Sequence, residues 1–180
     1  IQENGFRETL LNFESHIGTH IDAPSHMLEN GKSLDQLPLD TFTGKSIIIN
    51  VPKTCSEINK SLILSYKERL KKVDFVLFKT GWSHYWGSPL YFEGFPTLTR
   101  DAVDRLISFT LKGIGFDTIS ADPADDDMYY NHLAAFNKGI IIIENLIFPN
   151  NLTVSEGEFF CFPLPFENAD GSPVRAIFKA

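Results

Sequence analysis

The chain has 180 residues, enough for one domain with a full hydrophobic core, and its 43% hydrophobic and 22% charged residues are typical of a globular protein. Its net charge of -7 disfavours nucleic acid or an anionic membrane surface as a partner. No apolar stretch approaches the roughly 18 residues of a membrane-spanning helix. Cys55 and Cys161 lie in unrelated contexts, which favours reduced thiols and a cytoplasmic location.

Strand and helix patterns alternate along the chain. The predicted strands cover residues 8–13, 46–51, 73–79, 113–116, 140–143, 159–162 and 174–178. The predicted helices cover residues 61–72, 99–112 and 128–137; the first has Leu62, Tyr66 and Leu70 on one face, and the second begins at Thr99. This order predicts an α/β fold, with a mixed sheet core and flanking helices, as a single domain over residues 1–180.

The segment 82–96 is rich in aromatic residues, glycine and proline. A long aromatic loop is expected to line a pocket or an interface rather than to extend into solvent. Ordinary core packing of Trp82 and Trp86 is the alternative interpretation.

The most informative segment places three of the five histidines and one aspartate within eleven residues: His16, His20, Asp22 and His26. Imidazole nitrogens and carboxylate oxygens are ligands that zinc and manganese prefer. Gly18 between the first two histidines and Pro24 beyond them argue against a helix. We therefore predict a shaped loop whose side chains converge on one point.

Two further groups lie later in the chain. His132 is on a predicted helix, and Glu144 lies at the carboxyl end of the apolar strand that follows, twelve residues further on. Ligand sites gather at strand carboxyl ends in α/β folds, and a carboxylate leaving the core must be solvated, paired or bound to a metal. Three such ligands suffice for one metal, whereas six groups would suit two metals.

Two less specific interpretations of the histidine cluster compete with a catalytic metal site. Surface histidines can cluster by coincidence, and structural zinc sites are usually closed and rich in cysteine. The acidic run of Asp122, Asp125, Asp126 and Asp127 lacks the calcium-loop pattern of an EF-hand. Helix capping and solvation explain that run better.

The run from His16 to His26, with Gly18, Thr19, His20, Asp22 and Pro24 at fixed spacing, resembles the signature of the metal-dependent cyclase family, which includes kynurenine formamidase and isatin hydrolase. Further similar segments lie at residues 80–82, 95–96, 115–120, 143–146, 163–165 and 171–176. The resemblance covers nearly the whole chain in order.

The resemblance implies a swivelling β/β/α domain that binds one or two divalent ions, zinc or manganese. His16 and His20 would bind the first metal, and His132 the second. Asp22 and Glu144 would bridge between them. A homodimer or homotetramer is also implied.

The implied activity is that of a metal-dependent amidohydrolase of the arylformamidase type, which acts in tryptophan catabolism. Metal-bound hydroxide would attack the carbonyl carbon of a small amide and so cleave its C–N bond, and His26 would act as general acid and base. The alternatives are hydrolysis of cyclic amides or lactones, dehydratase-like chemistry, and a non-catalytic metal-binding protein of the same fold.

The chain opens at Ile1 rather than at a methionine, so we expect further residues upstream. In the formamidases an N-terminal strand and loop precede the motif and contribute an aromatic residue to the substrate pocket. The substrate itself is therefore not assigned from the sequence.

Overall fold

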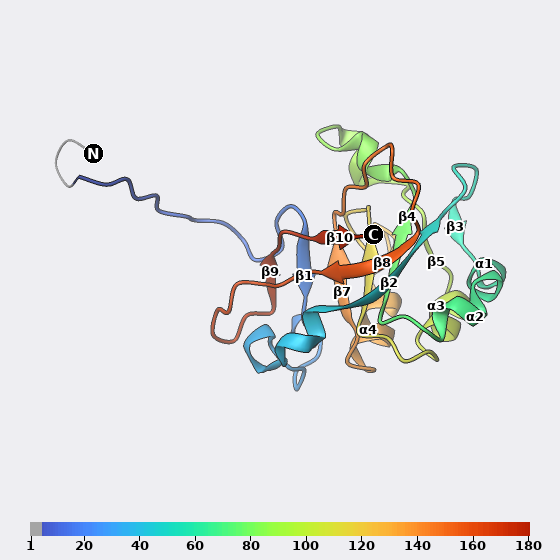
Figure 1. The fold of residues 1–180 in the computed structure, drawn as a ribbon, viewed down its shortest axis with the longest axis horizontal. Coiled ribbons are helices and arrows are strands. Elements are labelled where there is room, and N and C mark those ends of the chain that lie inside the picture. Colours follow the sequence, from blue (N-terminus) through green and yellow to red (C-terminus); the bar gives the residue numbers. More distant parts are fainter. Residues whose placement is uncertain (1–4) are drawn as a thin grey trace.

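An eight-stranded sheet forms the centre of the molecule (Figure 1). The structure is a computed structural model that describes residues 5–180. The strand order is β10-β8-β2-β4-β6-β7-β1-β9. In chain order these strands are β1 (His20–Asp22), β2 (Thr43–Asn50), β4 (Phe75–Lys79), β6 (Gly113–Phe116), β7 (Ile141–Glu144), β8 (Glu156–Phe160), β9 (Gly171–Pro173) and β10 (Ile177–Lys179). The short strands β3 (Glu57–Ile58) and β5 (Thr97–Leu98) form a second, two-stranded sheet.

The four middle strands, β2, β4, β6 and β7, are parallel to one another. Each outer strand is antiparallel to every strand with which it pairs; the outer strands are β10 and β8 on one side and β1 and β9 on the other. A parallel sheet is buried on both faces, and its strands are therefore continuous apolar runs. Successive residues alternate between two hydrophobic clusters: Ile47 and Ile49 belong to one, and Ile48 belongs to the other.

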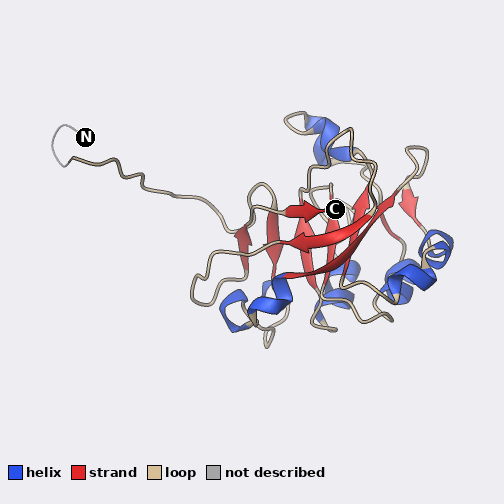
Figure 2. Ribbon diagram, in the orientation of Figure 1, coloured by secondary structure: helices blue, strands red, loops and turns tan. Residues whose placement is uncertain are grey.

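Helices cover one face of this sheet (Figure 2). They are α1 (Lys60–Ser65), α2 (Lys67–Leu70), α3 (Arg100–Leu106) and α4 (Tyr130–Phe136), and they bury Ile63, Leu106 and Phe136 against it. On the other face, Phe159 of β8 packs in one hydrophobic cluster with Leu34 and Phe42, which lie on short 3-10 turns.

The mixed α/β architecture predicted from the sequence is confirmed, with differences at element boundaries. The helix predicted over residues 61–72 is interrupted at Tyr66, and the one predicted over 99–112 ends at Leu106. Residues 8–13 are not a strand; they belong to an arm that leaves the body of the molecule before β1 (Figure 1). Among residues 5–180 no helix has the length and apolarity needed to cross a membrane.

We predicted a loop over the whole histidine-rich segment, and this prediction is wrong for part of it. His20, Ile21 and Asp22 form strand β1, and a 3-10 turn, η1 (Pro24–His26), follows. The reason is tertiary: β1 pairs with β7 on one side and β9 on the other, and the Ile21 side chain is fully buried. Gly18 and Pro24 therefore delimit a short strand instead of excluding regular structure.

Candidate metal centre

Strand β1 sets the geometry of the site. His20 and Asp22 are two residues apart in a strand, so their side chains lie on the same face, while Ile21 points into the core on the other. In the register between β1 and β7, His20 lies opposite Glu144. Three predicted ligands are thus brought together by two hydrogen-bonded strands.

His132 joins these residues from helix α4. The Nε2 atom of His132 lies 3.2 Å from Oε1 of Glu144 and 3.8 Å from Oδ2 of Asp22. The Nε2 atom of His20 lies 3.2 Å from Oδ1 of Asp22 and 3.5 Å from Oε2 of Glu144. Two imidazoles therefore face the same two carboxylates, and all four side chains are buried.

The other ring nitrogen of each of these histidines is fixed by the protein. Nδ1 of His20 donates to the carbonyl of Gly18 over 2.8 Å, and Gly18 has a positive φ of 61° that favours glycine. Nδ1 of His132 donates to Oδ2 of Asp122 over 2.5 Å. These bonds leave each Nε2 atom facing the carboxylates, which is the arrangement of histidines that bind metal ions.

Sequence reasoning missed the role of Asp122. The expected helix capping is confirmed, because its carboxylate accepts from the backbone N–H groups of Asn131 and His132 at the start of α4. The expected solvation is wrong for Asp122, because this residue is 1% exposed and its carboxylate holds the His132 ring. An acidic run in a sequence does not show which of its members is buried.

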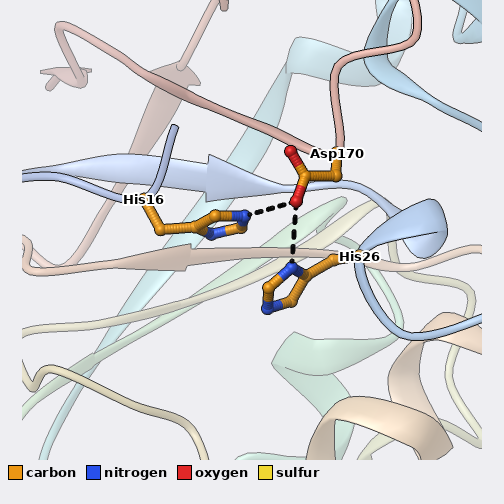
Figure 3. Close-up of side chains that lie close together, drawn as sticks. All are labelled: His16, His26 and Asp170. Carbon is orange, nitrogen blue, oxygen red and sulfur yellow. Dashed lines mark hydrogen bonds and ion pairs between the residues drawn. The ribbon is translucent and has the colours of Figure 1, made fainter. Parts of the chain in front are cut away.

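A second carboxylate that the sequence did not single out is Asp170, on the loop before β9. Its Oδ2 atom lies 3.1 Å from Nε2 of His16 and 3.3 Å from Nδ1 of His26 (Figure 3). His16 also contacts Oδ1 of Asp22 through Nδ1, at 2.6 Å. Gly171 allows this packing, since a Cβ atom there would lie 2.5 Å from the His16 ring.

The charges at the centre are strongly coupled. Burial and the neighbouring charge of Asp22 raise the pKa of Glu144. Burial alone would raise the pKa of Asp22, but hydrogen bonds from the surrounding histidines hold it well below its usual range. Burial lowers the pKa of His132, yet its bonds to carboxylates outweigh this and raise the pKa to about 11. Protons on histidine thus balance buried negative charge, a task that a divalent cation can take over.

The donor atoms fit such a cation. One group of three, formed by His16, His20 and Asp22, has one ligand atom per residue with all three atoms within 4.8 Å of one another. A second group, formed by Asp22, His132 and Glu144, meets the same condition, and the two groups share Asp22. Nitrogen and carboxylate oxygen are the donors that zinc and manganese accept.

All six groups predicted from the sequence line one pocket of about 570 Å³: His16, His20, Asp22, His26, His132 and Glu144. The aromatic loop contributes Trp86, Tyr91 and Phe92 to its wall, which confirms that this loop lines a pocket, whereas Trp82 lines a different cavity. Tyr91 donates through its hydroxyl to Oδ1 of Asn145 over 2.6 Å and so ties the loop to the residue after Glu144.

Comparisons with known proteins identify relatives of this chain. The family model described as "Putative cyclase" matches residues 4–123. A kynurenine formamidase of Bacillus thuringiensis subsp. konkukian is 34% identical over 169 residues, which cover 94% of this chain and 78% of that protein.

Solved structures show the same likeness. One titled as a potential metal-dependent hydrolase with cyclase activity has a TM-score of 0.76 and 30% identity, covering 92% of this chain and 79% of its own. Isatin hydrolase A from Labrenzia aggregata has a TM-score of 0.78 and 25% identity, covering 90% of this chain and 72% of its own. The chain therefore belongs to the cyclase family.

Proposed function

We propose that this protein is a metal-dependent hydrolase that cleaves the C–N bond of a small aromatic amide, with a formamide as the first candidate substrate. The observation that carries the proposal is the meeting of His20, Asp22, His132 and Glu144 at the floor of a pocket that also contains His26. The formamidase relative supports an open-chain formamide. The isatin hydrolase neighbour makes a cyclic aromatic amide the second candidate.

Zinc or manganese is the proposed cofactor, with one or two ions per chain. His16, His20 and Asp22 would hold one ion, and Asp22, His132 and Glu144 would hold the other. Such an ion supplies Lewis acidity, which polarises a carbonyl and makes water a nucleophile near neutral pH.

His26 is the proposed general acid and base. Burial and the charge of His16 lower its pKa below the ordinary 6.5, so the ring is mainly neutral at pH 7 and can accept a proton. It would take a proton from the attacking water and return it to the leaving nitrogen. The new C–O bond and the broken C–N bond then leave a carboxylic acid and an amine.

The pocket wall supports an aromatic substrate. Trp86, Tyr91 and Phe92 from the aromatic loop line the same cavity as the proposed metal ligands, and Ile17 and Met27 add apolar surface. Flat aromatic walls bind a flat ring through apolar contact and favourable ring geometry.

We also propose that the protein assembles as a homodimer or homotetramer. In the arm before β1, Leu10 is 94% exposed and Leu11 is 66% exposed, which supports burial against another copy. Light scattering on the purified protein tests this, and a monomer at all concentrations contradicts it.

Activity is tested with a panel of N-formylkynurenine, formanilide, isatin and an aromatic lactone. The protein is assayed as purified, after removal of metal with a chelator, and after addition of Zn²⁺ or Mn²⁺. We expect hydrolysis of at least one amide, its loss without metal and its recovery with metal. A metal-loaded protein that hydrolyses no amide of the panel contradicts the proposal, and hydrolysis of the lactone alone favours an esterase.

A further inference from the structure

Asp170 occupies an unusual position between two histidine rings. Its Oδ2 atom faces Nδ1 of His26 at 3.3 Å and Nε2 of His16 at 3.1 Å, as Figure 3 shows. Its Oδ1 atom accepts from the hydroxyl of Ser15 over 3.1 Å, and its backbone carbonyl accepts from the N–H of Ala23 over 2.8 Å. The carboxylate is thus held from both sides next to the turn that carries His26.

We propose that Asp170 is a positioning residue that sets the orientation and tautomer of His26. The inference deepens the proposed function and rests on His26 as its acid and base. Within residues 5–180, Asp170 is the one hydrogen-bond partner of the His26 ring, which also packs against the His16 ring at 3.9 Å between centroids with the ring planes tilted by 35°. An ionised carboxylate can only accept a hydrogen bond, so Nδ1 of His26 must carry the hydrogen.

The consequence lies at the other ring nitrogen. With Nδ1 as the donor, Nε2 of the neutral ring has a free lone pair, and Figure 3 shows it on the side of the ring away from Asp170. The proton of the attacking water goes to Nε2 and then to the leaving nitrogen, so the ring returns to its starting state. Asp170 stays ionised throughout and stabilises the cationic ring between the two transfers.

The alternative role for Asp170 is support of His16 as a metal ligand. Nε2 of His16 faces Asp170 at 3.1 Å and its Nδ1 faces the proposed metal ligand Asp22 at 2.6 Å, whereas Asp170 is the one hydrogen-bonding side chain that contacts the His26 ring within residues 5–180. The two roles differ in what they affect. Support of His16 alters metal affinity, and positioning of His26 alters the rate with metal bound.

The first experiment compares Asp170→Ala with Glu167→Ala in the zinc-loaded protein. Glu167 is exposed on the same loop, so its variant removes the same charge and controls for general effects. Asp170→Ala is expected to lower kcat about 10- to 100-fold, a part of the roughly 10²- to 10⁴-fold that general acid–base catalysis contributes, with KM and zinc content unchanged. Loss of zinc, or an unchanged kcat, overturns the proposal.

Added acetate provides a readout that a purely structural role would not give. Since the Asp170 side chain is 45% exposed, its removal leaves a space that a small carboxylate can reach. We expect acetate to restore part of the lost kcat in Asp170→Ala and to leave the Glu167→Ala protein unaffected. Absence of any rescue counts against a specific carboxylate at this place.

The second experiment needs no substrate, so it separates this inference from the proposed function. In zinc-loaded protein labelled with ¹⁵N-histidine, NMR identifies which nitrogen of His26 carries the hydrogen, and His26→Gln assigns the signal. We expect the Nδ1–H form in the parent and its loss or mixing with the Nε2–H form in Asp170→Ala. The same tautomer in both proteins overturns the inference even if the parent is an active hydrolase.

Discussion

Replacing Asp122 by asparagine tests whether the metal centre depends on a residue outside the proposed ligand groups. The Asp122 carboxylate is 1% exposed, and its Oδ2 atom accepts from Nδ1 of His132 over 2.5 Å. Asparagine keeps the size of the side chain and one acceptor oxygen, but it removes the charge. Either His132 or a backbone N–H at the start of α4 then faces an amide nitrogen instead of an oxygen.

The expected magnitude follows from this loss. Removing the outer partner of a metal-binding histidine typically lowers metal affinity about 10- to 100-fold. That range corresponds to about 1.4–2.8 kcal/mol. Folding stability should fall as well, by about 1–3 kcal/mol, because a buried donor loses its acceptor.

Zinc affinity is measured by competition with a chromophoric chelator, and stability by urea unfolding of the metal-free protein. The matched control is Asp125→Asn, which removes a charge from an exposed residue of the same acidic run. We expect the control to bind zinc as the parent does. If Asp122→Asn also binds zinc with parental affinity, then His132 either does not bind the metal or does not need this carboxylate.

Three further predictions concern His26, Tyr91 and Cys161. His26→Ala should retain zinc by elemental analysis while kcat falls roughly 10²- to 10⁴-fold; an equal kcat would remove its proposed role. Tyr91→Phe deletes the donor to Asn145 and should lower the free energy of unfolding by about 1–2 kcal/mol, and an unchanged urea midpoint would show that this bond is not needed. Burial raises the pKa of the Cys161 thiol. The stabilisation of the folded state that this shift contributes is complete below the ordinary thiol pKa of 9.0 and is lost as the pH rises above that pKa. Urea unfolding from pH 8 to 10.5 should therefore show a decline in stability that is smaller in Cys161→Ala; identical slopes would contradict this.

The sequence was sufficient for the strands at the centre of the sheet, because apolar runs such as Ile140 to Ile143 are typical of strands buried on both faces. It was also sufficient to select the six groups that line the pocket. Side-chain chemistry and short spacing are local properties, and both can be recognised without a structure.

Other features depend on contacts between distant segments. Asp170 lies 144 positions from His26, and its residue type alone does not distinguish it from an exposed loop aspartate. Asp122 looked like one member of a solvated run, although the fold buries it beside His132. Strand β1 was misjudged for the same reason, since its pairing with β7 and β9 is decided by tertiary structure.

Anomalous diffraction from crystals grown with Zn²⁺, recorded on both sides of the zinc absorption edge, tests the metal centre most directly. We predict at least one strong peak bounded by Asp22, His132 and Glu144, with a second, where two ions bind, bounded by His16, His20 and Asp22. A fully occupied zinc ion elsewhere in the chain, or no peak among these residues at saturating zinc, would contradict the proposed metal centre.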